Sequence, residues 1–350
     1  MRVFTCQSCG QLLHFENTSC MRCGSPLGFL PASLTLSALS DEGHGLTAMA
    51  DGGSWKPCGN ASQALCNWLI PHDDAAGYCP ACSLNRTIPD LAQHGNAERW
   101  QALEAAKRRL IYALMRLGLP LASRHENEAT GLAFDFLADA GPDEKVLTGH
   151  DDGLITINIA EADSAERERR RLELGEPYRT LLGHLRHEVG HYYWDVLVRD
   201  GGRIDESRSV FGDESEDYQQ ALDRHYKNGA PAGWEANYVS SYATMHPWED
   251  FAETWTHYLH MVDTLDTAAS FGLAVAPEAT NDPTMETEIA FDPYTTRNFD
   301  RLVHSWLPLT VAVNSLNRSM GQPDLYPFAL TPATIEKLRF IHDLVRAGRS

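Results

Sequence analysis

Beyond residue 95 the chain repeats apolar residues at the spacing of amphipathic helices. In residues 96–118, Trp100, Leu103 and Leu110 recur at intervals that fall on one helical face. Asn96 precedes them as a suitable N-cap. The segment is therefore predicted to be a helix of about six turns.

The same periodicity and the usual helix-start signals predict further helices downstream. They are expected at about 176–198, 214–227, 248–264, 297–320 and 332–346. We expect the helix at 297–320 to be kinked near Pro308. We expect the last helix to begin with Thr331 as N-cap and Pro332 in its first turn. The charged run at 164–172 is typical of a solvated helix start.

Two short segments alternate apolar and polar residues with the period of a β-strand. They are LAFDF at 132–136 and LITINI at 154–159, and the turn sequence HDDG precedes the second. Residues 96–350 are thus predicted to form a mostly helical domain with a small sheet. We expect LITINI to be an edge strand, where an extended peptide could pair with it. The fold class predicted for the whole chain is α+β.

The first 82 residues contain all eight cysteines of the chain. The first group is Cys6, Cys9, Cys20 and Cys23, which form two CxxC pairs. Each pair is followed by a glycine, Gly10 or Gly24, which permits the left-handed turn after a metal-binding knuckle. Two such pairs at this spacing predict a zinc ribbon with one structural zinc ion, in preference to iron or disulfides.

The second group is less regular. It consists of Cys58, Cys66, Cys79 and Cys82, of which only the last two form a CxxC pair. Cys58 and Cys66 could instead be small buried apolar residues, and His72 could substitute as a ligand. We interpret the four cysteines as a second structural zinc site, because a lone CxxC pair rarely holds zinc unaided.

These observations divide the chain into three predicted parts. Residues 1–30 are the zinc ribbon, residues 31–95 hold the second four-cysteine segment and a connector, and residues 96–350 are the helical domain. A small module with little apolar content needs metal ions to fold, so both sites are expected to be structural.

The formal charge of −19 argues against binding nucleic acid, because the chain would be repelled by phosphate. The cysteine-rich part also has few lysines and arginines. No apolar run approaches the roughly 20 residues of a membrane span, and the N-terminus lacks the apolar core of a signal peptide. We therefore expect a cytoplasmic protein with no membrane partner.

The helix at 176–198 contains the sequence HEVGH. Its histidines, His187 and His191, are four residues apart and project from one face, so they can hold one zinc ion. Glu188 stands next to the first histidine and can reach a metal-bound water. The alternative is two histidines on an ordinary amphipathic helix.

A third protein ligand is needed, and the metzincin pattern fails because Trp194 and Leu197 occupy its glycine and histidine positions. The segment at 245–260 supplies Glu249 and Glu253, one turn apart on one face. The residues alone leave open which of the two is the ligand.

HEVGH followed by SSYATMHPWEDFAETWTHYL resembles the active-site helices of the gluzincin metallopeptidases, especially those of the anthrax lethal factor type. The whole chain resembles a bacterial zinc-binding metallopeptidase family with an N-terminal zinc-ribbon domain. The resemblance implies a zincin-like catalytic domain that hydrolyses peptide bonds with one catalytic zinc ion.

The resemblance also implies a role for individual residues. His187, His191 and Glu249 correspond to the zinc ligands and Glu188 to the general base. Glu253 corresponds to the carboxylate that orients a ligating histidine. Tyr242 matches the tyrosine that faces the oxyanion, the alternative being a packed aromatic ring. His184, one turn before His187, could be a spare ligand or a histidine of the substrate groove.

With these ligands, zinc would activate a water molecule and Glu188 would accept its proton as the water attacks a peptide carbonyl. The predicted partner is a peptide or protein substrate, and the predicted cofactors are one catalytic and two structural zinc ions. Two other classes remain open: a zinc-ribbon adaptor with a non-catalytic zincin-like domain, and a nucleic-acid-binding ribbon protein, which the charge disfavours.

Overall fold

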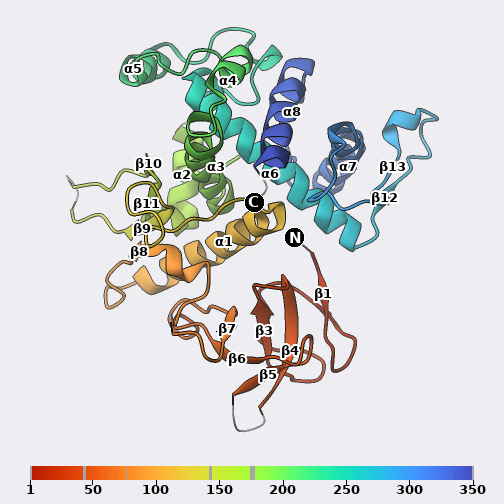
Figure 1. Cartoon of the computed structure of the whole chain (residues 1–350). Helices are drawn as coiled ribbons and strands as arrows, with labels where there is room; N and C mark the ends of the chain where they lie inside the picture. The colour runs from red at the N-terminus through yellow and green to blue at the C-terminus, as the bar shows by residue number, and fades with distance from the viewer. Residues whose placement is uncertain (1, 42–44, 76, 142–143, 174–177, 349–350) are drawn as a thin grey trace. The chain divides into compact units, whose positions relative to one another are not determined.

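The computed structural model describes residues 2–41, 45–75, 77–141, 144–173 and 178–348. It divides into two compact units. The first comprises Met1–Arg116 with Leu121–Glu166, and the second comprises Leu117–Pro120 with Arg167–Ser350 (Figure 1). The first unit holds the larger sheets and the second is mostly helical, so the predicted α+β fold class is confirmed.

A five-stranded antiparallel sheet dominates the N-terminal segment. Its strands follow chain order: β3 (Leu27–Leu30), β4 (Thr35–Asp41), β5 (Leu46–Ala48), β6 (Ser54–Pro57) and β7 (Leu69–Pro71). The pair β1 (Phe4–Thr5) and β2 (Leu12–Leu13) precedes it. Leu30, Leu39, Ala48 and Leu69 form its apolar core. This sheet was not predicted from the sequence, because four of its strands have only three or four residues and the seven-residue β4 is buried at consecutive positions instead of alternate ones.

A second sheet of four strands lies in the same unit, in the order β10-β11-β9-β8. The strands are β8 (Asn85–Thr87), β9 (Ala133–Leu137), β10 (Gly149–Asp151) and β11 (Leu154–Asn158). β8 and β9 are parallel, and α1 (Asn96–Leu117) connects them.

The expectation that LITINI is an edge strand is wrong. This segment is β11, which pairs with β9 on one side and β10 on the other. Its backbone groups are therefore engaged in the sheet and are not offered to a peptide. The turn at 150–153 that precedes it is the end of a hairpin whose other strand, β10, takes the outer position.

Helices make up most of the second unit. They are α2 (Ser164–Glu173), which starts in the first unit, α3 (Leu181–Tyr193), α4 (Ile204–Phe211), α5 (Tyr218–Asn228), α6 (Pro247–Ser270), α7 (Phe299–Ser319) and α8 (Pro332–Ala347). A small pair of strands, β12 (Ala274–Val275) and β13 (Thr287–Glu288), lies between α6 and α7. The predicted helices are present, and α4 was not predicted.

The ends of these helices follow local capping chemistry. Thr180 caps α3, with its side chain accepting a hydrogen bond from the backbone of Gly183. Thr331 caps α8 in a capping box, as expected. The helix predicted at 176–198 begins only at Leu181, residues 176 and 177 lying outside the described residues, and its last part, Trp194–Arg199, is a π-helical turn. α7 runs on through Pro308.

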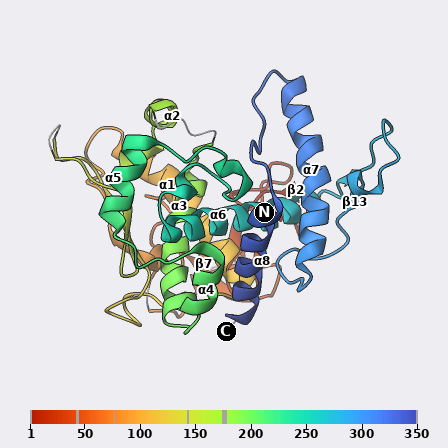
Figure 2. The same cartoon turned by 90° about the horizontal axis from the view of Figure 1, so that it is seen from above.

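α3 and α6 lie side by side in both views (Figure 1, Figure 2). The contact is close because HEVGH contains Gly190: a Cβ atom there would lie 3.1 Å from Ala252 Cα and 3.3 Å from Trp255 Cβ. Tyr193 and Trp255 stack across the same interface with ring centroids 4.8 Å apart. This packing fixes the register between the two helices that carry the predicted site.

Among the residues that the structure describes, none of the helices combines the length and the apolar character needed to cross a membrane.

Candidate functional site

α3 brings the two histidines of HEVGH together. His187 Nε2 and His191 Nε2 lie 3.2 Å apart, one helical turn from each other. Both residues are buried, with exposed fractions of 9% and 3%. The two nitrogens therefore converge on one point inside the helical unit.

Glu249 reaches the same point from the first turn of α6. One carboxylate oxygen, Oε2, lies 2.9 Å from His187 Nε2, and the other lies 3.5 Å from His191 Nε2. The three ligand atoms lie within 4.8 Å of one another. Two imidazole nitrogens and one carboxylate oxygen form a donor set that suits zinc and leaves a further coordination position open. The residues present thus fit the ion that the sequence predicts.

Glu253 approaches His187 from the opposite side of its ring. Its Oε1 lies 2.8 Å from His187 Nδ1, and Ser240 Oγ donates a hydrogen bond of 2.5 Å to its Oε2. Because a carboxylate only accepts, Nδ1 carries the proton and Nε2 keeps its lone pair for a metal. Glu249 and Glu253 therefore occupy different positions, which the sequence could not distinguish.

Glu188, the glutamate of HEVGH, is paired with His184, which lies one helical turn before it in α3. His184 Nε2 lies 3.1 Å from Glu188 Oε1, and Glu188 is 5% exposed. Burial by itself raises the pKa of Glu188, but the hydrogen bond from His184 and the nearby histidine charges outweigh it, so the pKa lies below its ordinary value. His184 lies beside Glu188 and is not one of the three residues whose ligand atoms converge.

The electrostatics of the site favour a positive charge. Burial lowers the pKa of His187, yet Glu249 and Glu253 reverse this effect and hold the pKa well above its ordinary value. Burial likewise raises the pKa of Glu249, and the two histidines bring it well below the usual range. A pair of buried carboxylates around imidazoles binds either a proton or a metal ion at this point.

The eight cysteines form the two predicted groups. In the first, Cys6 and Cys23 have their sulfurs 3.8 Å apart, and Cys9 and Cys20 have theirs 3.6 Å apart. Gly10 adopts a φ of 73° and Gly24 a φ of 74°, as expected after a knuckle.

The second group consists of the four buried residues Cys58, Cys66, Cys79 and Cys82. Its sulfurs are close, with Cys66 and Cys79 3.8 Å apart. Hydrogen bonds from Cys66, Cys79 and Cys82 lower the pKa of Cys58. Such a thiolate-forming cluster suits a structural zinc ion, and His72 is not part of it.

Comparison with known proteins matches two families to consecutive parts of the chain. A zinc-ribbon domain matches residues 3–93. The family described as "Putative zinc-binding metallo-peptidase" matches residues 96–344, more than half of the chain. The chain belongs to this zinc-binding metallopeptidase family. The resemblance to a zinc-binding metallopeptidase family with an N-terminal zinc-ribbon domain is thereby confirmed.

Members from mycobacteria are similar over almost their full length. The chain is 45% identical over 346 residues to the uncharacterized protein Rv2568c of Mycobacterium tuberculosis H37Rv and to the uncharacterized protein Mb2598c of Mycobacterium bovis. The match covers 99% of this chain and 95% of each relative. No solved structure matches the chain.

In this metallopeptidase family member, Tyr242 lies in a short turn, Tyr242–Thr244, just before α6. Its ring centroid is 5.9 Å from that of His187. Burial, followed by the charge of Glu249, raises the pKa of Tyr242, so the hydroxyl keeps its proton and can donate a hydrogen bond. This position is compatible with the predicted oxyanion role and with simple packing.

Three contacts around the site were not predicted. Tyr218 donates a hydrogen bond of 2.9 Å to Glu249 Oε1, the Trp248 ring lies 3.7 Å from that of His191, and Ser240 holds Glu253. Ser240 and Trp248 lie within the segment SSYATMHPWEDFAETWTHYL but were assigned no role, and Tyr218 belongs to no motif. Only Trp248, adjacent to Glu249 in the sequence, could have been found by proximity.

The loop that carries Tyr242 is attached to α8. Lys337 Nζ donates hydrogen bonds of 2.7 Å to the carbonyl oxygen of Asn237 and 2.6 Å to Asp250 Oδ2. Asp250, which follows Glu249, is fully buried. The lysine therefore joins the loop, the first turn of α6 and α8 at one point.

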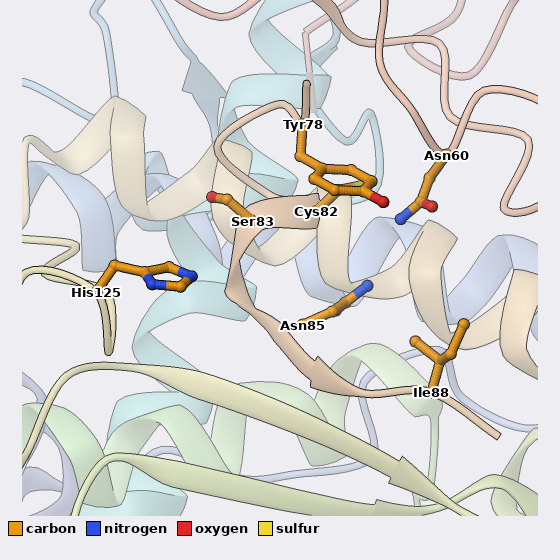
Figure 3. Close-up of a pocket in the computed structure, with 7 residues that line it drawn as sticks. All are labelled: Asn60, Tyr78, Cys82, Ser83, Asn85, Ile88 and His125. Carbon is orange, nitrogen blue, oxygen red and sulfur yellow. The ribbon is translucent and has the colours of Figure 1, made fainter. Parts of the chain in front are cut away.

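A small cavity of about 300 Å³ lies beside the second cysteine group in the first unit (Figure 3). It is lined by Asn60, Tyr78, Cys82, Ser83, Asn85, Ile88 and His125. Of these, Cys82 alone was predicted as a metal ligand. On its buried side, Cys82 Sγ lies 3.9 Å from Glu104 Oε2.

Proposed function

We propose that this protein is a zinc-dependent peptidase that hydrolyses peptide bonds through a gluzincin-like centre. The observation that carries the proposal is the convergence of His187, His191 and Glu249 on one point. The carboxylate of Glu188 lies on α3, the helix that carries the two histidines. His187, His191 and Glu249 would hold the zinc ion. A bound zinc ion supplies Lewis acidity, which polarises a carbonyl group and lowers the pKa of water.

Glu188, Tyr242 and Glu253 have the other roles in the proposed reaction. Glu188 accepts a proton from the attacking water and delivers it to the leaving amine nitrogen. Its lowered pKa keeps it ionised at neutral pH, as a base must be. Tyr242 donates its hydroxyl hydrogen bond to the oxyanion that develops on the carbonyl oxygen. Glu253 keeps the His187 ring in the orientation that presents Nε2.

The proposed substrate is a peptide or protein, and the proposed site of action is the cytoplasm, because eight zinc-binding thiols require a reducing compartment. We assign catalysis to residues 96–350 and structural zinc binding to residues 1–30 and 31–95. The adaptor alternative would keep all three metal sites and show no hydrolysis.

The test is cleavage of a peptide library by the zinc-loaded full chain and by its Glu188→Gln variant. We expect the variant to lose hydrolysis and to keep its zinc, because the side chain moves a proton and is not a ligand. Elemental analysis of both proteins controls for metal loss. Equal cleavage by the two proteins would refute the assigned base, and no cleavage by the wild type with full zinc occupancy would favour the adaptor.

A further inference from the structure

Tyr218 is the first residue of α5, and its hydroxyl reaches into the proposed metal site. The O–H group donates a hydrogen bond of 2.9 Å to Glu249 Oε1. The other oxygen of the same carboxylate, Oε2, lies 2.9 Å from His187 Nε2. Oε1 itself lies 3.5 Å from His191 Nε2, so each oxygen of Glu249 faces a different histidine and only Oε1 accepts a hydrogen bond from Tyr218.

The position of Tyr218 is fixed by several contacts. Asp217 caps α5 with its side chain, and His246 Nε2 lies 3.1 Å from the carbonyl oxygen of Glu216, to which it donates. The Tyr218 ring packs edge-on against His246 and Trp248, with centroid distances of 5.4 and 6.0 Å. His246 is also the N-cap of α6, so the start of α5 is tied directly to the helix end that carries Glu249.

A carboxylate can bind a metal ion through one oxygen or through both. The hydrogen bond from Tyr218 occupies a lone pair of Oε1, which lies 3.5 Å from His191 Nε2, whereas Oε2 lies 2.9 Å from His187 Nε2 and accepts no hydrogen bond from the described residues. A neutral hydroxyl suits this task, because a lysine or arginine would cancel the negative charge that attracts the ion.

We propose that Tyr218 is a positioning residue of the metal centre, which fixes Glu249 as a ligand through the single oxygen Oε2. The inference rests on the metal centre of the proposed function and extends it to a residue from a separate helix. Partners of this kind orient metal ligands and typically change metal affinity about 10–100-fold when removed.

The test compares Tyr218→Phe with Tyr226→Phe in the full chain. Both substitutions remove one hydroxyl from α5, and Tyr226 is 64% exposed. We expect Tyr218→Phe to weaken zinc binding about tenfold, measured by chelator competition. We also expect it to change the visible absorption of the cobalt-substituted protein, because the carboxylate can turn towards two-oxygen binding. Tyr226→Phe should match the wild type in both measurements.

A double-mutant cycle shows whether Tyr218 acts through Glu249. In a Glu249→Ala background, measured with a weaker chelator, Tyr218→Phe should cause no further loss of zinc affinity. A further tenfold loss there would overturn the proposal, as would an unchanged affinity and cobalt spectrum in the single variant. Thermal melting of the metal-free proteins controls for folding.

These readouts do not need peptidase activity. If the wild type binds zinc and cleaves no peptide, the proposed function fails while the result for Tyr218 still stands. If cleavage requires Glu188 but Tyr218→Phe binds zinc normally, the proposed function stands and the role of Tyr218 is refuted.

Discussion

His187 Nδ1 and Glu253 Oε1 lie 2.8 Å apart, although the residues are 66 positions apart in the chain. This hydrogen bond fixes the orientation of the imidazole, because the carboxylate accepts the Nδ1 proton and leaves Nε2 to bind either a metal ion or a second proton. The ring therefore presents Nε2 to Glu249. Glu249 and Glu253 of α6 thus approach different nitrogens of the same histidine.

This relationship predicts different outcomes for two alanine variants. Glu249→Ala removes a metal ligand and should strongly weaken zinc binding at this site. Glu253→Ala leaves the three ligands in place and should reduce zinc affinity or activity about 10–100-fold. Chelator competition measures the affinity, and Glu249→Gln controls for the charge. A greater loss of zinc in Glu253→Ala than in Glu249→Ala would require exchanging the two roles.

We predict three zinc ions per chain, because three groups of ligand atoms converge in the described residues. Elemental analysis of freshly purified protein should give a ratio near three. Cys9→Ser and Cys79→Ser should each lower it by one, whereas Glu188→Gln should leave it unchanged. A ratio near one in the wild type would show that the cysteine groups do not hold zinc.

Lys107 should be essential for the stability of the first unit. Its ammonium group and the Glu104 carboxylate form an ion pair of 2.7 Å, and both side chains are completely buried. Glu104 also lies near Cys82, and Arg108 Nη1 is 4.0 Å from Glu104 Oε2, so loss of the lysine leaves a buried carboxylate with only this more distant cation. We expect Lys107→Met to destabilise the protein by about 3–5 kcal/mol in denaturant unfolding.

The matched control for this prediction is the double variant Lys107→Met/Glu104→Gln. It removes the carboxylate charge that Lys107 neutralises, and it should recover part of the lost stability. If Lys107→Met is as stable as the wild type, the ion pair between Lys107 and Glu104 is not essential for the stability of the first unit.

The protein should lose stability in mild acid because His342 is buried in its neutral form. This histidine is fully buried, and burial, followed by the charge of Arg346, lowers its pKa from 6.5 to about 4. Between these values the unfolded chain binds a proton that the folded protein does not, so stability falls as the pH decreases from 6.5 to 4. The contribution is on the order of 3 kcal/mol.

The measurement is the melting temperature across this pH range for the wild type and His342→Gln, both without metal. The glutamine keeps a group that can accept the hydrogen bond of Tyr258, whose hydroxyl lies 3.1 Å from His342 Nδ1. We expect a shallower pH dependence in the variant. Parallel curves would show that His342 does not contribute to the acid sensitivity.

Several features of this protein could be predicted from local sequence alone. The spacing of Cys6, Cys9, Cys20 and Cys23 specifies a metal knuckle within two short turns. The spacing of His187 and His191 places both on one face of any helix they form. Helical periodicity also located most of the helices, because amphipathic patterns extend over many residues.

Features that depend on pairing between distant segments were missed or mistaken. LITINI alternates like an edge strand, but β10 covers its outer side, and nothing in its own residues specifies that partner. The five-stranded sheet was not predicted, because most of its strands are short and the longest, β4, shows no alternation of buried and exposed positions. Tyr218 was missed because it lies 31 residues from Glu249 and belongs to no motif.

The sequence by itself determined which residue types could hold zinc and on which helical faces they lie. Only the tertiary structure decided which acid of α6 meets which nitrogen of His187, and that Tyr218 meets the other oxygen of Glu249. Helical geometry fixes positions three or four residues apart. The register between α3, α5 and α6 depends instead on the packing at Gly190 and on the capping contacts of His246, and these arise only when the helices are assembled.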